Sequence, residues 1–200
     1  MGKTTPAFLL YALLASVPFT MADDGPTTPL SISRQFPSHG TIHMNLTGGD
    51  YSICAAATDE IHVMATAEYP ADPGRLQADI VIRGSQATIV TGGPHINTHF
   101  TIAVPRRSNL LIRLEAGTIQ IEKIEGNLDV NNHAGDVYVR LARASDYRYV
   151  DASVYAGDLN APAFGTSKSG MFRSIHWTGS GAYRLRAHLG AGELNLEAAE

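Results

Sequence analysis

Three carboxylates occupy the same place in three similar segments of the chain, and their type and spacing suggest cation binding. Asp136, Asp158 and Glu193 each follow directly after a glycine. If these segments stack as strands about 4.8 Å apart, the carboxylates line up in a column. Stacked carboxylate oxygens are ligands for calcium, although a Gly-Asp pair is also ordinary turn chemistry. The three residues are therefore calcium candidates, and no other metal or cofactor is predicted.

Arginine and aromatic residues near the end of the chain suggest a second kind of site. Arg184 and Arg186 are two residues apart, so on a strand they share one face. Trp177 and Tyr183 are close by in sequence. Arg pairs with carboxylate or phosphate, and aromatic rings stack on flat apolar faces. The four residues are candidates for a surface that binds a polymer, while the alternative is a solvated strand face with the arginine stems covering their neighbours.

The sequence contains no convincing pattern of catalytic residues. Glycosidases need two carboxyls about 5–10 Å apart, one acting as acid, and nothing in the sequence distinguishes such an acid. Ser145 and Ser153 lack the nucleophile-elbow pattern. Cys54 lies in a strand-like run, which indicates packing rather than reactivity. We predict that the chain is not an enzyme, with a carbohydrate-active enzyme as the alternative.

The elements that would position these residues are strands. Short stretches such as 41–46 and 110–114 alternate apolar and polar residues, which is the pattern of half-buried strands. Glycine followed by a polar residue and two apolar residues spaced by two recurs in AGTIQI (116–121), EGNLDV (125–130), AGDVYV (134–139), AGDLN (156–160) and AGELNL (191–196). One such unit cannot bury its apolar face alone, whereas stacked units can. We predict an all-β domain, a short β-solenoid with a less regular, sandwich-like N-terminal part; a plain β-sandwich is the alternative.

This repeat series resembles a bacterial exported family known as the putative adhesins, domains of unknown function built as a β-strand "toast rack". The resemblance extends from about Phe36 to Leu196, and the segment 172–196 strengthens it. It implies a stacked β-strand fold and an envelope or extracellular location. The family supplies no agreed catalytic residues, so none is transferred to this chain.

The beginning of the sequence is typical of an exported protein. Lys3 precedes an apolar run of 14 residues, 6–19, and small residues precede Asp23. That run is shorter than the roughly 20 residues that a membrane-spanning helix needs, so we predict a signal peptide at 1–22, cleaved near Ala22. A flexible leader at 23–35 and the β-repeat domain at 36–197 are expected to follow, with no transmembrane span in the mature chain.

Composition narrows the choice of partners. The net charge is −4, which argues against a nucleic-acid partner because phosphate binding needs clustered positive charge. We therefore predict an exported, non-enzymatic, adhesin-like interaction module, located in the periplasm, at the cell surface or outside the cell. Its expected partner is an envelope polymer or protein. A structural envelope component that self-associates through exposed strand edges is a further alternative, and the sequence leaves the oligomeric state open.

Overall fold

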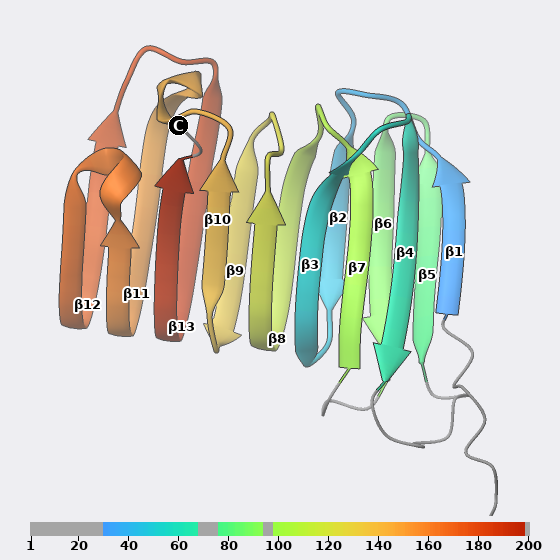
Figure 1. Ribbon diagram of the computed structural model, residues 1–200, viewed down its shortest axis with the longest axis horizontal. Helices are drawn as coiled ribbons and strands as arrows, with labels where there is room; N and C mark the ends of the chain where they lie inside the picture. The colour runs from blue at the N-terminus through green and yellow to red at the C-terminus, as the bar shows by residue number, and fades with distance from the viewer. Residues whose placement is uncertain (1–29, 68–75, 94–97, 199–200) are drawn as a thin grey trace, which may run out of the picture.

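The protein is built from strands arranged in two layers. A computed structural model describes residues 30–67, 76–93 and 98–198, and Figure 1 shows their strands side by side. The predicted signal peptide lies outside the described residues. Within the described part of the chain, no helix is both long and apolar enough to cross a membrane. The all-β prediction is confirmed.

Thirteen strands and two single-turn 3-10 helices occur among the described residues. The first seven strands are β1 (Leu30–Gln35), β2 (Thr41–Leu46), β3 (Gly49–Ala56), β4 (Glu60–Ala67), β5 (Gln77–Arg83), β6 (Gln86–Gly92) and β7 (Thr98–Pro105). The rest are β8 (Asn109–Glu122), β9 (Leu128–Ala134), β10 (Val137–Leu141), η2 (Ala144–Asp146), β11 (Tyr147–Ala161), η3 (Pro162–Phe164), β12 (Thr166–Thr178) and β13 (Tyr183–Ala198).

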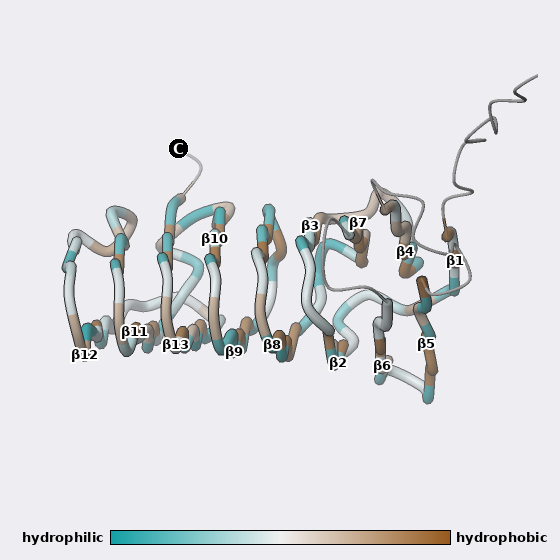
Figure 2. Tube along the Cα trace, turned by 90° about the horizontal axis from the view of Figure 1, so that it is seen from below, coloured by the Kyte–Doolittle hydropathy of each residue, from teal (hydrophilic) through white to brown (hydrophobic). Residues whose placement is uncertain are grey.

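The strands form one continuous sheet that is folded onto itself. The front layer has the order β1-β4-β7-β3-β8-β10-β13-β11-β12. The back layer contains β5, β6, β2 and β9 together with the other halves of β8, β13, β11 and β12. Figure 2, seen along the strands, shows the two layers facing one another. The two layers pack face to face, as in a β-sandwich. Unlike the sheets of a plain sandwich, they are connected through the long strands, each of which has one half in each layer.

Each of the long strands β8, β11, β12 and β13 crosses between the layers at a glycine with positive φ. Gly117 and Gly192 both have φ +132°, a conformation that side chains with a Cβ rarely adopt. A Cβ on Gly192 would overlap the carbonyl oxygen of Gly135, and one on Gly117 would overlap that of Gly49. The bend glycines thus stack directly on one another, in the spatial order Gly49, Gly117, Gly135, Gly192 and Gly157. The repeated glycine of the sequence is required at these positions by both its φ and the close backbone approach.

The stacking order differs from the order along the chain. β13, the last strand, lies between β10 and β11 and pairs in parallel with both. β12 closes this end of the sheet as an antiparallel partner of β11. In a simple solenoid each coil stacks on the coil that precedes it in sequence, so the insertion of β13 is a departure from the expected progression.

The hydrophobic core fills the space between the layers. β2 shows how alternation produces it, because Ile42, Met44 and Leu46 are buried while the residues between them face outward. Tyr51 and Phe100, on neighbouring front strands, stack with ring centroids 4.9 Å apart. Burying each such side chain stabilises the fold by about 1.5–3 kcal/mol.

The prediction of a flexible leader at 23–35 is wrong for its last six residues. Residues 30–35 form β1, which pairs antiparallel with β4 from Leu30↔Ala65 to Gln35↔Glu60. Leu30 and Ile32 are half-buried and pack against the core. Their burial and the backbone hydrogen bonds with β4 offset the entropy lost on ordering this segment.

Candidate binding surface

The predicted arginine and aromatic residues do not form one surface. Arg184 and Arg186 are exposed on the outer side of the back layer. Trp177 pairs with the buried Val150, and its ring lies 4.9 Å from that of Phe164. Trp177 and Tyr183 therefore pack against the core while the arginines point to solvent.

Arg186 lies among acidic side chains on the back layer. Arg186 lies in register between Asp129 of β9 and Asp151 of β11. Asp151 also makes an ion pair with His176 of β12, with 3.1 Å between its Oδ1 and the ring Nδ1. The charges on this face alternate in sign, so it does not offer a concentrated positive surface to an anionic polymer.

The three turn carboxylates do lie side by side on the front layer. The backbone N–H of Glu193 donates to Asp136 Oδ1 at 3.0 Å, and Glu193 is in register with Asp158. Glu193 Oε1 also accepts a hydrogen bond from the Asn160 amide at 3.0 Å. Within the described ranges no group of three or more His, Cys, Asp or Glu side chains is arranged to hold a metal ion. The carboxylates thus serve the backbone and a neighbouring amide, and calcium binding stays a prediction.

A row of uncharged polar side chains crosses the front layer beside these carboxylates. Each member is in register with the next, on seven neighbouring strands: Thr101, Ser52, Gln120, Tyr138, Asn195, Asn160 and Ser167. We call this row the polar lane. Its six inter-strand spacings of about 4.8 Å give it a length of about 29 Å. All seven side chains point away from the core because their strand neighbours, such as Ile121 and Val139, point into it.

Charged rows run along both sides of the polar lane. The row nearer the bends contains Asp50, Asp136, Glu193 and Asp158. The row on the other side contains Glu122, Arg140 and Glu197 in register. The residues named in these two rows therefore carry six carboxylates and a single guanidinium, so the lane is flanked mainly by negative charge.

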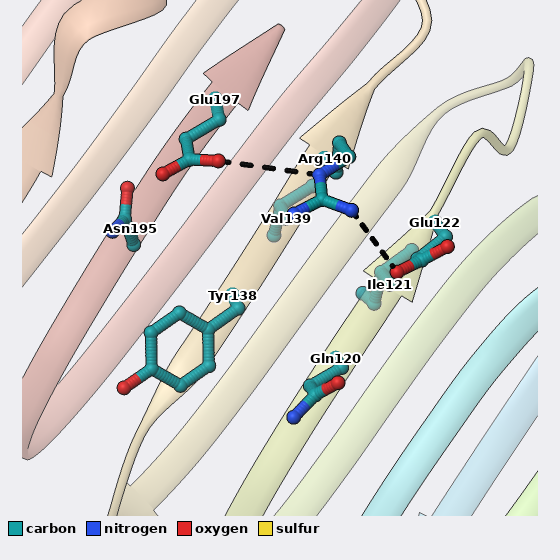
Figure 3. A pocket seen from close by; sticks show the side chains of 8 residues that line it. All are labelled: Gln120, Ile121, Glu122, Tyr138, Val139, Arg140, Asn195 and Glu197. Atoms are coloured by element: carbon teal, nitrogen blue, oxygen red, sulfur yellow. Dashed lines mark hydrogen bonds and ion pairs between the residues drawn. The ribbon is translucent and has the colours of Figure 1, made fainter. Parts of the chain in front are cut away.

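The middle of the polar lane is hollowed. A depression of about 280 Å³ is lined by Gln120, Tyr138, Asn195, Glu122, Arg140 and Glu197, together with Ile121 and Val139. Figure 3 shows Arg140 between the two glutamates at one rim and Tyr138 at the other end. Arg140 Nη1 is 3.4 Å from Glu122 Oε1, and its Nε is 4.0 Å from Glu197 Oε2. The guanidinium is thus partly neutralised where it borders the depression.

The Tyr138 hydroxyl and the Asn195 side-chain oxygen are the two hydrogen-bonding groups of interest in the depression. Burial raises the pKa of the Tyr138 phenol, and the carboxylates of Asp136 and Glu193 raise it further. The phenol is therefore protonated at neutral pH and hydrogen-bonds to Glu193. The side-chain oxygen of Asn195 is buried and has no hydrogen-bond partner among the described residues. A buried acceptor of this kind costs about 1–3 kcal/mol when left unsatisfied, so a donor at this point would relieve that cost.

Sequence reasoning missed the polar lane, although the repeat contains a signal for it. Gln120, Tyr138, Asn160 and Asn195 each occupy the fifth position of their repeat, counted from the residue before glycine. The calcium prediction rests on the third position, which carries the turn carboxylates. Period-two alternation places both positions on the same outer face, so aligning the repeats would have found the lane.

An exposed apolar patch at the β12 end was also missed. Tyr155, Met171 and Phe172 are 57%, 57% and 70% exposed, and the Tyr155 and Phe172 rings meet edge to face at 4.8 Å. Phe172 has φ +57°, a left-handed conformation that costs a non-glycine residue about 1–2 kcal/mol. Tyr155 and Phe172 fall in a break in the β11–β12 register beside the bend glycines, and the sequence does not reveal this break.

Comparisons with known proteins give the fold. The structure is similar to that of a putative cell adhesion protein from Clostridium sporogenes, with a TM-score of 0.53 and 11% sequence identity, covering 86% of this chain and 100% of that one. More distant are putative adhesins from Parabacteroides merdae (TM-score 0.30, 9% identity, 59% of this chain and 53% of that one) and Bacteroides fragilis (TM-score 0.26, 10% identity, 86% and 97%). No protein-family model and no curated protein matches the chain. At this identity the likeness shows the fold alone, and that fold is the one implied by the resemblance of the repeats.

Proposed function

We propose that this chain is an exported, non-enzymatic binding module that presents the outer face of its front layer to an envelope polymer or protein. The observation that carries the proposal is the polar lane, with its central depression held on seven hydrogen-bonded strands. Side chains on such strands are pre-organised, which reduces the entropy lost on binding. The stacked, glycine-bent units act here as a short solenoid-like scaffold that fixes the positions of the lane side chains.

Export is part of the proposal and rests on the N-terminal sequence. Cleavage near Ala22 releases a chain that begins at Asp23. N-terminal sequencing of the protein recovered from outside the cytoplasm is expected to read Asp-Asp-Gly. Recovery of the uncleaved chain from the cytoplasm contradicts export.

A matched pair of surface variants tests the binding face. Gln120→Lys places a long cation in the polar lane, and Asn131→Lys places the same side chain on the outer face of the back layer. Both positions are exposed, so both variants are expected to fold. The wild-type chain and Asn131→Lys should cosediment with the envelope fraction of the producing cells, and Gln120→Lys should do so several-fold less. Equal retention of both variants, or equal loss, refutes binding through the front face.

Self-association is a second candidate, favoured by the patch of Tyr155, Met171 and Phe172 beside an edge strand. β12 pairs with β11 alone among the described residues. However, Lys168 and Arg173 lie opposite the buried Leu159 and Val154, so two cations face the space between the layers. Inward charges of this kind protect sheet edges from further pairing.

Sedimentation velocity over a hundredfold range of concentration separates the two candidates. Wild type is expected to stay monomeric. Oligomers that form with rising concentration and disappear in Phe172→Ser support self-association instead.

A further inference from the structure

The polar lane has the chemistry of a site for an uncharged, linear glycan, and this inference rests on the proposed function. Amide and hydroxyl groups dominate the lane, and both kinds can donate and accept hydrogen bonds. Sugar hydroxyls need both kinds of partner at closely spaced points. The lane supplies them at one per strand for about 29 Å, which suits an extended chain rather than a compact molecule.

Tyr138 provides the apolar component that a sugar ring needs. It stands at the centre of the lane, between Gln120 and Asn195 on the two neighbouring strands, and Figure 3 shows its ring beside the depression. An aromatic ring with one polar tip can cover the apolar face of a sugar while its hydroxyl stays hydrogen-bonded. The depression lets a sugar ring approach this side chain below the level of the surrounding surface.

The unpartnered oxygen of Asn195 marks the same point. It is buried without a donor from any described residue. Its neighbour Asn160 already donates to Glu193 at 3.0 Å and accepts from Ser167 at 2.6 Å. Asn195, beside Tyr138, thus carries a buried acceptor without a partner among the described residues, and a sugar hydroxyl that reaches it would satisfy it.

The flanking charges select against acidic polymers. Four carboxylates line one side of the lane and two the other, and the guanidinium of Arg140 is shared between Glu122 and Glu197. A polyanion would meet like charges along both sides, which rejects it as a partner. A neutral chain meets no such repulsion, and its hydroxyls can donate to the carboxylates.

We propose that the polar lane binds an uncharged linear polysaccharide, seated over Tyr138 with one hydroxyl on Asn195. Isothermal titration of the full mature chain with cellohexaose, chitohexaose and hexagalacturonate tests the class of ligand. At least one of the two neutral hexamers is expected to bind, and the acidic hexamer is expected to bind at least tenfold more weakly or not at all.

Lane variants locate the binding. Tyr138→Ala and Gln120→Ala should each weaken the neutral hexamer at least tenfold, whereas Asn131→Ala on the back layer should leave its affinity unchanged. Gln120 is exposed, so its variant keeps the test valid even if loss of Tyr138 lowers stability. Preferential binding of the acidic hexamer, or neutral binding that ignores both lane variants, overturns the inference.

Failure of the inference can be told from failure of the proposed function. If no hexamer binds but envelope retention still depends on Gln120, the front face binds another class of partner and the glycan inference is wrong. If no hexamer binds and retention is also insensitive to Gln120→Lys, both are wrong.

Discussion

Replacing Gly192 by alanine is expected to disrupt the stack that holds the polar lane. Gly192 has φ +132°, and an added Cβ would overlap the carbonyl oxygen of Gly135 on the neighbouring strand. The same substitution at Gly92, near the end of β6, meets only Gln77 atoms at 3.6 Å, which is ordinary contact. The two variants therefore differ in backbone strain and close approach while adding the same methyl group.

The expected loss of stability at Gly192 follows from two terms. Holding alanine in that backbone conformation costs about 1–3 kcal/mol. The overlap must also push apart neighbouring strands that are joined by Gly135 N–H to Ala191 O at 2.9 Å and Glu193 N–H to Asp136 Oδ1 at 3.0 Å. Weakening one such bond in a buried setting adds about 1–3 kcal/mol, so we expect a total of about 4 kcal/mol. Gly92→Ala is expected to change stability by less than about 0.5 kcal/mol.

Urea unfolding followed by circular dichroism measures both variants. For a domain of this size each kcal/mol lowers Tm by about 2–4 °C, so thermal unfolding of Gly192→Ala should fall by about 8–16 °C. A Gly192→Ala protein within about 1 kcal/mol of wild type, with Gly92→Ala unchanged, refutes the direct stacking of the bend glycines. It would also contradict the register that places Asn195, three residues later, beside Tyr138.

Three further outcomes follow from buried and half-buried side chains. The Tyr51 hydroxyl makes hydrogen bonds with Thr91 Oγ1 at 2.8 Å and Thr47 O at 2.9 Å, whereas the buried Tyr147 hydroxyl has no partner among the described residues. Tyr51→Phe should therefore lower the free energy of unfolding by about 1–2 kcal/mol, and Tyr147→Phe should leave it unchanged or raise it. Urea titration measures both free energies. Burial, with smaller effects of Asp146 and Tyr183, raises the pKa of Tyr147 above the ordinary 10.0. Its contribution to stability is then complete below pH 10 and lost as pH rises from there, so the urea midpoint should fall in alkali, less steeply in Tyr147→Phe. Burial and the Glu122 carboxylate raise the pKa of the Cys54 thiol, so iodoacetamide at pH 8 should alkylate the folded chain more slowly than the unfolded chain, and Glu122→Gln should speed the reaction.

The inside and outside of each strand could be predicted from the sequence, but the neighbours of each strand could not. Alternation placed Ile42 and Met44 in the core because a strand has a period of two. The same rule does not say which strand lies alongside, since the backbone hydrogen bonds that join strands are the same for every sequence. The surface predicted from Trp177 and Arg184 illustrates this limit: nearness along the chain suggested a shared face, and the register turned Trp177 inward.

What the sequence by itself determined is the unit: a glycine that bends the chain, an outward polar residue after it, and apolar residues that face a core. Those features are local, because φ at a glycine and the alternation of a strand depend on a few adjacent residues. Only the tertiary structure decided that β13 inserts between β10 and β11. That insertion sets Asn195 beside Tyr138 and completes the polar lane. Pairing over so long a separation depends on the summed packing of whole layers, which no single segment of the sequence specifies.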